Sequence, residues 1–298
     1  MSQTGGRDRG GRSISRSLRE YGRGIAGGLL FSLPLLYTME VWWAGFIARP
    51  LRLLVYLAVG FLLLCSYNRY AGLHKDASWL EVVFEAVEEM GIGLFLAALF
   101  LWLLGQIDGS TPASELVGKV VIEAVTVAIG VSVGSSQLGS AGQGKSGGPS
   151  EGGMEEGGKG KKEEGQRQLG LTGQITLASC GAVLFASNVG PTEEIVQIAL
   201  GTSHVRILAL AALSLLLSAF ILFYIDFAGS QRRETGDSRW EVVLHSSLNY
   251  AVALAASAFI LWFFGRFAGT SPGICLAQTV VLGVAGALGA STGRLLLR

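Results

Sequence analysis

Residues Glu81–Pro112 read EVVFEAVEEMGIGLFLAALFLWLLGQIDGSTP, and a related stretch, EVVLHSSLNYAVALAASAFILWFFGRFAGTSP, returns 160 positions later at Glu241–Pro272. Ten of the 32 paired positions are identical, including every Gly and Pro of the closing turn. Chance spacing of apolar residues would not reproduce that turn, so the chain contains an internal repeat. Each copy is an apolar run long enough to form a membrane-spanning helix.

The composition places the chain in a membrane. Half of the 298 residues are hydrophobic, 15% are charged, and the mean hydropathy is +0.48, which leaves too little polar surface for a water-soluble fold of this size. The apolar runs are continuous rather than alternating, which favours an all-α integral membrane protein over a β-barrel. Eight transmembrane helices are predicted, at 25–47, 51–67, 79–104, 113–134, 172–197, 205–227, 240–264 and 273–292.

Weaker echoes extend the repeat. Gly27-Gly-Leu-Leu-Phe31 corresponds to Gly181-Ala-Val-Leu-Phe185, 154 positions on, and Thr38 and Glu40 recur as Thr192 and Glu194. The fold prediction is therefore two parallel four-helix repeats, related by an axis along the membrane normal. The predicted divisions are a basic disordered arm (1–24), the first repeat (25–134), a Gly-rich flexible cytoplasmic linker (135–171) and the second repeat (172–298).

Two features of the spans predict how they pack. Pro34 removes a backbone donor in the first span, so we expect a kink there, with Ser32 or a neighbouring helix satisfying the freed carbonyl. Gly130 with Gly134, and Gly286 with Ala290, have the four-residue spacing of helix-packing contacts, which could extend to a homo-oligomer.

The distribution of basic residues predicts the orientation. With eight spans, 18 of the 23 Lys and Arg residues fall on one side of the membrane and four on the other, while Lys119 lies within a span. Under the positive-inside rule, both termini are cytoplasmic. The first apolar run is over twenty residues long and lacks a small-residue cleavage site, so it is a retained helix rather than a signal peptide. The Arg-rich arm orients this helix, and no nucleic-acid partner is expected.

The sequence contains no convincing enzyme signature. There is no HExxH motif and no GxSxG nucleophile elbow, and Cys65, Cys180 and Cys275 lie in apolar runs without a CxxC pair. Gly139-x-x-x-x-Gly144-Lys145-Ser146 matches a phosphate-binding loop, but a membrane helix precedes it and Gly-Gly-Pro follows, so nucleotide binding at 139–146 is not expected. The prediction is a non-enzyme without a cofactor, and the identity of any metal stays open.

Carboxylates inside the first copy are the main candidates for function. Glu81, Glu85 and Glu88 are spaced i, i+4, i+7, and Glu89 lies close to the same helical face. Glu81 and Glu85 are expected near solvent at the cytoplasmic entrance. Glu88 and Glu89 lie about 15 Å along the helix axis. A charge at that depth costs ~3 kcal/mol or more unless it is paired, protonated or facing a water-filled cavity.

Lys119 and Glu123 follow at i, i+4 on the next span, with Glu123 expected at about the depth of Glu88 and Glu89. One interpretation is an internal ion pair that holds helices together. The other is that carboxylates outnumber the single lysine, which leaves unpaired acids with proton-linked behaviour near neutral pH. The acids in question are Glu40, Glu88, Glu89, Glu123, Glu193 and Glu194.

The second copy carries different residues on the matching face, where His245 replaces Glu85 and Asn249 replaces Glu89. His245 is either a hydrogen-bonded packing residue or a proton relay or cation ligand. The helix-breaking run Asn188-Val-Gly-Pro-Thr-Glu193-Glu194 is either a cation-coordinating site built from freed carbonyls and carboxylates, or an ordinary kink near the outer surface.

These residues lead to two functional hypotheses. The first is a secondary transporter or channel for protons or small cations, with Glu88, Glu89, Glu123, His245 and Asn249 lining a path between the halves and Glu40, Glu193 and Glu194 on the outer side. The second is a non-transporting structural or sensory membrane protein whose carboxylates are fixed by internal pairs. In both cases the lipid bilayer is the surrounding partner.

The run GGLLFSLPLLYTMEVWW at residues 27–43, together with the two Trp-x-x-Gly…Gly-x-x-Pro turns, resembles a family of bacterial integral membrane proteins of unknown function. The resemblance covers most of the chain apart from the arm and the linker. It implies a location in the bacterial inner membrane and supplies no catalytic residues.

Overall fold

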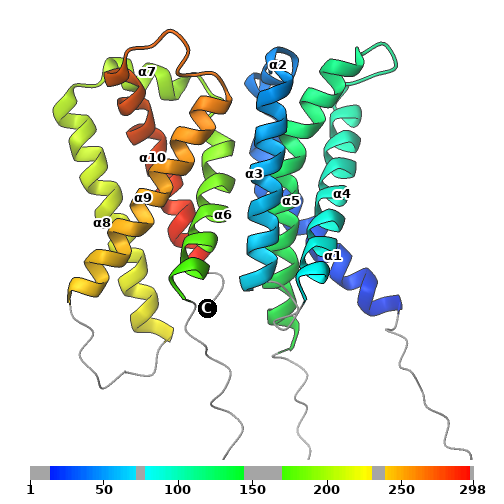
Figure 1. Ribbon diagram of the computed structural model, residues 1–298, viewed down its shortest axis with the longest axis horizontal. Coiled ribbons are helices and arrows are strands. Elements are labelled where there is room, and N and C mark those ends of the chain that lie inside the picture. The colour runs from blue at the N-terminus through cyan, green and yellow to red at the C-terminus, as the bar shows by residue number, and fades with distance from the viewer. Residues whose placement is uncertain (1–13, 72–77, 144–169, 230–238, 296–298) are drawn as a thin grey trace, which may run out of the picture.

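The computed structural model describes residues 14–71, 78–143, 170–229 and 239–295, and all the secondary structure in these ranges is helical. Figure 1 shows the ten described helices as two groups that lie side by side, α1–α5 and α6–α10. The first group contains α1 (Ile14–Leu36), α2 (Met39–Ile47), α3 (Pro50–Ala71), α4 (Trp79–Leu103) and α5 (Ala113–Gln143). The second contains α6 (Leu171–Val189), α7 (Glu194–Gly201), α8 (His204–Gly229), α9 (Arg239–Phe263) and α10 (Pro272–Leu295).

Six of these helices are long and apolar enough to cross a membrane by themselves: α3, α4, α5, α8, α9 and α10. Two further pairs pass the same test only as bent units, with α2 turned by 83° from α1 and α7 turned by 88° from α6. The described residues therefore contain six candidate spans, or eight if each bent pair counts as one. The predicted helical membrane protein is confirmed at this level.

Both bends fall where the sequence predicts a break, after Pro34 in the first span and within 188–194 in the fifth. Pro34 lies two residues before the end of α1, and the Asn188 side chain of α6 fills the gap that Pro34 opens: its amide donates to the Phe31 carbonyl at 2.9 Å and accepts from the Leu35 N–H at 3.0 Å. Ser32 donates to the Gly28 carbonyl. The Phe31 carbonyl and the Leu35 N–H, which would bond each other in an unbroken helix, thus find partners on a neighbouring helix, as expected for broken helices at membrane depth. The Ser32 bond goes to Gly28 rather than to Leu30, whose carbonyl loses its donor at Pro34.

Two boundaries differ from the prediction. Helix α1 begins at Ile14, inside the expected arm, and α5 continues to Gln143, beyond the expected start of the linker at 135. Near these ends the two helices pack on each other, with Gly24 and Gly27 of α1 facing Ser135 and Gly134 of α5. The rest of the arm (1–13) and of the linker (144–169) lies outside the described residues. Of the phosphate-loop match, residues 139–143 belong to α5 and 144–146 are not described.

Small residues allow the closest helix crossings in both groups. A Cβ at Gly27 of α1 would lie 2.9 Å from the Gly130 carbonyl oxygen and would overlap Gly134. A Cβ at Gly181 of α6 would overlap Gly289 and would lie 3.1 Å from the Gly293 Cα. Gly130 and Gly134 are therefore packing contacts within the chain, as expected from their spacing.

The closing turns of the repeated stretch have the same geometry in both copies. Gly105 has φ +69° and Gly265 has φ +74°, a conformation that favours glycine. In the first copy Gln106 N donates to Leu101 O at 2.8 Å, and in the second Arg266 N donates to Leu261 O at 2.9 Å. Each glycine also donates its N–H to the carbonyl three residues earlier, Gly105 to Trp102 and Gly265 to Trp262. Together the two bonds make each turn a Schellman motif that ends its helix.

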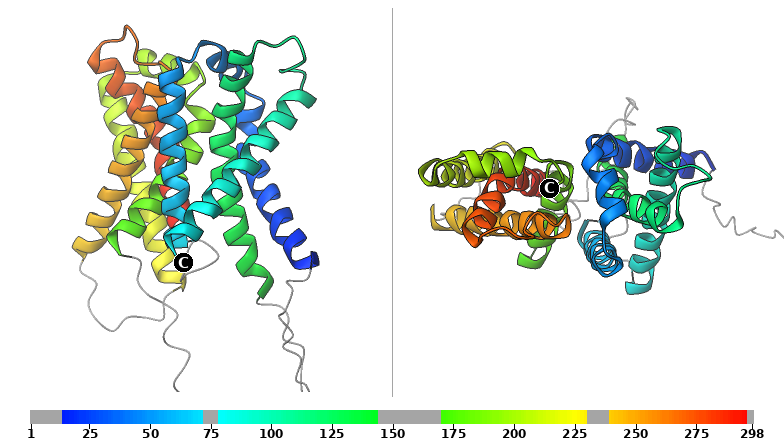
Figure 2. Two further views of the ribbon diagram at one scale, coloured as in Figure 1. Left: turned by 45° about the vertical axis from the view of Figure 1, so that its right-hand side comes forward. Right: turned by 90° about the horizontal axis from the view of Figure 1, so that it is seen from above.

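The two groups of helices meet mainly through α3 and α6, which lie next to each other in Figure 2. The Tyr56 ring of α3 stacks on Phe263 of α9, with centroids 4.1 Å apart and an interplanar angle of 14°. A small apolar cavity of about 20 Å³ lies between α1, α3, α5, α6 and α10. That volume holds about one water molecule.

Candidate functional site

Three helices bring Glu89 into a polar cluster, the Glu89 cluster, made of Asn68, Glu89 and Ser132. The Asn68 amide of α3 donates to the Glu89 carboxylate of α4 at 2.8 Å, and the Ser132 hydroxyl of α5 donates to the Asn68 carbonyl oxygen at 2.7 Å. Asn68 and Ser132 are buried, whereas Glu89 is partly buried. The carboxylate is therefore held by a directed amide donor rather than by a cation.

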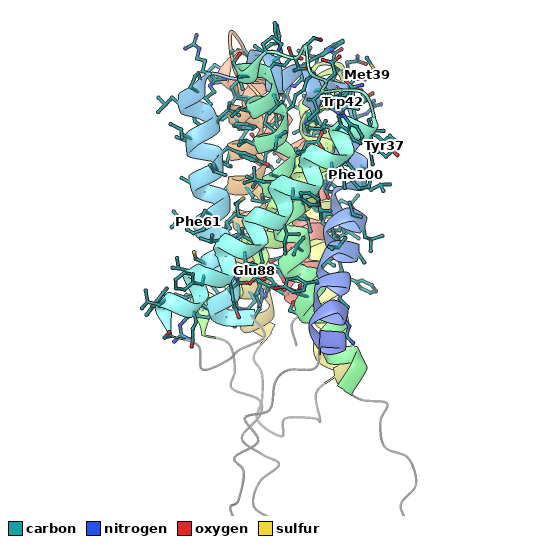
Figure 3. All side chains as sticks on the ribbon, turned by 90° about the vertical axis from the view of Figure 1, so that its right-hand side faces the viewer. Tyr37, Met39, Trp42, Phe61, Glu88 and Phe100 are labelled. Atoms are coloured by element: carbon teal, nitrogen blue, oxygen red, sulfur yellow. The ribbon has the colours of Figure 1, made fainter. Side chains whose placement is uncertain are left out.

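Glu88 and Glu81 do not belong to the Glu89 cluster, and each has a different hydrogen-bond partner. Glu88 is exposed and accepts a hydrogen bond from the Tyr21 hydroxyl of α1. Glu81 forms a capping box with Ser78, whose N–H donates to its carboxylate at 2.7 Å, so this acid stabilises the start of α4. Figure 3 places Glu88 towards the end of the molecule opposite Trp42 and Met39.

Glu123 lies in a second polar cluster, the junction cluster, made of Trp42, Tyr56, Glu123, Thr126 and Ser187. Glu123 has no exposed surface, and neither of its carboxylate oxygens has a hydrogen-bond partner among the residues that the structure describes. The Trp42 indole N–H faces the carboxylate without reaching hydrogen-bonding geometry. Tyr56 and Thr126 join their hydroxyls at 3.4 Å, and the buried Ser187 hydroxyl of α6 faces Tyr56.

Lys119 does not pair with Glu123. Its ammonium group lies 2.6 Å from Glu115, one turn in the other direction on α5, and donates to the Gln106 carbonyl at 2.9 Å. The Gln106 carbonyl lies just beyond the Schellman turn, so Lys119 ties the loop that follows α4 to α5. The ion-pair interpretation of Lys119 and Glu123 is wrong, and Glu123 stays without a basic partner among the described side chains.

The two carboxylates of the first group lie at different levels of α5. Glu89 reaches Ser132, nine residues beyond Glu123, which corresponds to ~13 Å along a helix axis. The expectation that Glu123 lies at the depth of Glu88 and Glu89 is therefore wrong. The reason is the register of α4 against α5, because Gly93, one turn beyond Glu89, already faces Ala124 and Ala128.

In the second group, Asn249 forms the corresponding polar contact, here called the Asn249 cluster. Its amide donates to Ser291 of α10 at 2.9 Å, and Ser291 in turn contacts the Ser218 hydroxyl of α8 at 3.3 Å. His245 is partly buried, and its Nδ1 has no hydrogen-bond partner. Arg294, which bonds the Gln174 side chain at 2.6 Å, also reaches the His245 carbonyl. His245 and Asn249 are thus held by contacts inside α6–α10.

The outer acids lie at the starts of the two short helices. Glu40 is partly buried in the first turn of α2, and the exposed Glu193 and Glu194 cap and open α7. Acidic side chains at helix N-termini interact favourably with the helix dipole. Asn188 is occupied by α1, and the Arg266 guanidinium bonds the Pro191 carbonyl, so a cationic side chain already faces the break. A bend between α6 and α7 therefore accounts for the run 188–194 without a cation-coordinating site.

Several cluster residues lay outside the predicted site, notably Asn68, Ser132, Tyr56 and Ser187. Tyr56 and Ser132 are single polar residues in apolar runs, and this is the signal that could have selected them. Asn68 stands beside Arg69, just after the expected span 51–67, and Ser187 stands beside Asn188, so neither is isolated. Within the described ranges, no three His, Cys, Asp or Glu side chains come together in a way that could hold a metal ion.

The helices, the bent spans and the buried carboxylates define a polytopic α-helical membrane protein. Over residues 20–297 the chain matches the family model described as "Putative integral membrane protein (DUF2391)", and it belongs to that family, whose function is unknown. No curated protein and no solved structure matches the chain.

Proposed function

We propose that the protein moves protons or small cations across the membrane, as a secondary transporter or channel that uses intramembrane carboxylates. The observation that carries this proposal is Glu123, which is fully buried in a candidate span and has no partner for either oxygen. A structural acid would be expected to keep its nearest cation, but Lys119 is engaged by Glu115. Unpartnered intramembrane acids are costly and usually serve a function.

The proposed path has two acidic levels. Glu123 forms the upper level in the junction cluster, and Glu89, with Glu88 nearby, forms the level ~13 Å further along α5. Glu40, Glu193 and Glu194 would attract cations at the outer end. Asn249 and His245 would contribute from the second group of helices, after a movement of one group against the other. Lys119, through its bond to Glu115, would change how strongly the outer level attracts cations.

We also propose that the chain is a tandem duplication of a four-helix unit with both copies inserted in the same direction. Support comes from the paired bends of 83° and 88°, the paired Schellman turns, and the paired glycine crossings at Gly27 and Gly181. Parallel repeats of this kind permit rocking about the junction between them. A homo-oligomer would have to use other surfaces than Gly130 and Gly134, which already pack within the chain.

The proposed location is the bacterial inner membrane with both termini cytoplasmic. The charge distribution supports it, and so does Figure 1, in which the described start of α1 and the end of α10 lie at the same end of the molecule. The bends α1–α2 and α6–α7 lie at the opposite end, which would face outwards.

A structural or sensory role is the second candidate, and one observation favours it. The cavity between the two groups of helices is apolar and holds about one water molecule, so the junction is closely packed rather than hydrated. A transporter would have to open this junction during its cycle, whereas a scaffold would keep it closed.

The test is flux through the purified full-length protein in liposomes. An internal pH dye would follow proton movement under an imposed pH gradient, and sodium and potassium gradients would be tested in the same vesicles. We expect flux in the wild type, its loss in Glu123→Gln, and reduced flux in Glu88→Gln/Glu89→Gln. Asp108→Asn, in an exposed turn, is the carboxyl-to-amide control and should keep wild-type flux. No flux under any gradient would favour the structural or sensory role.

A further inference from the structure

The junction cluster draws its five side chains from both groups of helices. Trp42 comes from α2, Tyr56 from α3, Glu123 and Thr126 from α5, and Ser187 from α6. Glu123, Thr126 and Ser187 have no exposed surface, and Tyr56 has 1%. Three of the members, Trp42, Glu123 and Ser187, carry polar atoms without hydrogen-bond partners. A concentration of unsatisfied polar groups in a buried site calls for an explanation, because such groups are normally paired.

We propose that the junction cluster is a proton-binding site, in which the Glu123 carboxyl group takes up and releases the proton and the hydroxyls of Tyr56 and Ser187 connect it to the second group of helices. This inference deepens the proposed function, on which it rests, by naming the bound species as a proton rather than a metal cation.

The first argument is the chemistry of the surrounding groups. The indole N–H of Trp42 is a donor only, so it suits a carboxyl oxygen and would repel a metal cation at the same position. Hard cations take several oxygen ligands, usually including more than one charged or carbonyl group. The cluster has one carboxyl group, and two of its hydroxyls, those of Tyr56 and Thr126, are already joined to each other.

The second argument is that the cluster suits both states of the acid. A protonated carboxyl group donates one hydrogen bond and accepts others, while an ionised one only accepts. A hydroxyl hydrogen rotates, so the Tyr56 dipole can turn to suit the ionised or the protonated acid, and Ser187 faces Tyr56 in turn. The protonated state has no net charge, which is the form that an apolar, unpartnered environment favours.

The third argument is isolation from other charges. Tyr56 of α3 is the titratable side chain that interacts electrostatically with Glu123. On α5 itself, Lys119 is paired with Glu115, and Glu89 of α4 is directed to Asn68 beside Ser132. Among the described residues, no Lys, Arg or His side chain forms an ion pair with Glu123. A proton can neutralise the acid without such a partner.

The position of the site links proton binding to the junction between the helix groups. Tyr56 stacks on Phe263 of α9, and Ser187 lies three residues before Gly190, where α6 ends and the chain bends into α7. A change in hydrogen bonding at Glu123 therefore acts directly on contacts that hold the two groups together.

The experiment is infrared difference spectroscopy on the full-length protein, reading the carbonyl stretch of a protonated carboxylic acid between low and high pH. The wild-type spectrum should contain a carboxylic-acid band that shifts in D₂O. Glu123→Gln should lose one such band, whereas the exposed-turn control Asp108→Asn should keep it. Tyr56→Phe should keep the band but shift its frequency, because a neighbouring hydroxyl dipole is removed. A purely structural role for Tyr56 would leave that frequency unchanged and would overturn its part in the site.

Adding sodium or potassium tests the alternative, a metal-cation site at Glu123. A difference spectrum or a thermal stabilisation that depends on either ion in the wild type, and that Glu123→Gln abolishes, would identify a metal-cation site and overturn the proposal. A wild-type protein in which the Glu123 band is missing at every pH would also overturn it. Because the band is read without any gradient, proton binding could be established even if liposome flux is absent, which would separate failure of transport from failure of this site.

Discussion

The two groups of helices hold equivalent polar contacts that differ in charge. In the first, Asn68, Glu89 and Ser132 connect α3, α4 and α5; in the second, Ser218, Asn249 and Ser291 connect α8, α9 and α10. Glu89 and Asn249 are 160 positions apart, the offset of the repeated stretch. The framework of three helices joined by side-chain hydrogen bonds is thus present twice, and an acid is present once.

The same asymmetry recurs at the junction cluster. The position 160 residues after Glu123 is Gly283, which packs against Leu254 and offers no polar side chain. Both intramembrane acids of the clusters therefore belong to the first group of helices. This difference indicates that the packing is shared between the halves and that any proton chemistry is concentrated in the first half.

The largest effect should come from the shared packing. Gly27→Leu and Gly181→Leu each force a side chain into a helix crossing that has no space for a Cβ, so we expect each to destabilise the protein by about 3 kcal/mol or more. Thermal unfolding in detergent would measure the loss. Gly91→Leu is the control, because a Cβ there meets nothing within 4 Å. A loss at only one of the two crossings would show that the halves are not packed alike.

The second effect concerns the charge difference. Asn249→Glu would give the second half the acid of the first, without an amide donor such as Asn68, and should destabilise the protein by roughly 3 kcal/mol. Asn249→Gln has nearly the same size without the charge, so the difference between the two melting temperatures isolates ionisation. Equal melting temperatures would mean that the second half tolerates an acid as well as the first does.

The third effect lies at the Pro34 turn. Asn188 stands 154 positions after Pro34, and its amide fills the backbone gap that this proline leaves. Asn188→Leu should cost about 2 kcal/mol, because the Phe31 carbonyl and the Leu35 N–H lose their partner. On a Pro34→Ala background, which lets α1 close its own hydrogen bonds, the loss should shrink. An identical loss on both backgrounds would contradict this coupling.

The smallest effect should be at the exposed turns. Hydrogen bonds from the Ser110 side chain and backbone, and from Thr111, lower the pKa of Asp108 below its ordinary value, whereas the second turn has Ala268 at this position. The folded-state pKa is lowered, so the stabilisation is present at neutral pH and is lost as the pH falls through that pKa. Asp108→Ala should lower the melting temperature slightly at neutral pH and not at all in acid. A pH-independent difference would rule out the carboxylate as its source.

Part of this organisation was predictable from local patterns. The apolar runs and the Trp-x-x-Gly…Gly-x-x-Pro turns predicted the helix positions closely, since span length and turn chemistry are set by neighbouring residues. The early start of α1 was missed, although Ile14, Leu18 and Tyr21 have the spacing of an amphipathic helix. Composition outweighed periodicity in that prediction, because the segment is rich in Arg, Gly and Ser.

The candidate site was predictable only as a set of residue types. Glu89 and Glu123 were selected because an acid in an apolar run is costly wherever it points, but their partners depend on which helices become neighbours. Lys119 illustrates the limit: at i, i+4 from both Glu115 and Glu123, it could have turned either way.

The amino-acid sequence by itself determined that the chain enters the membrane, where most of its helices lie, and that a stretch is repeated, because these properties follow from local hydropathy and turn chemistry. Only the tertiary structure decided that Asn188 completes the Pro34 turn, that Lys119 bonds Glu115 and that Glu123 is left between Trp42, Tyr56 and Ser187. Such contacts join residues up to about 150 positions apart, and the hydrophobic pattern does not specify which of several polar groups will meet once the helices pack.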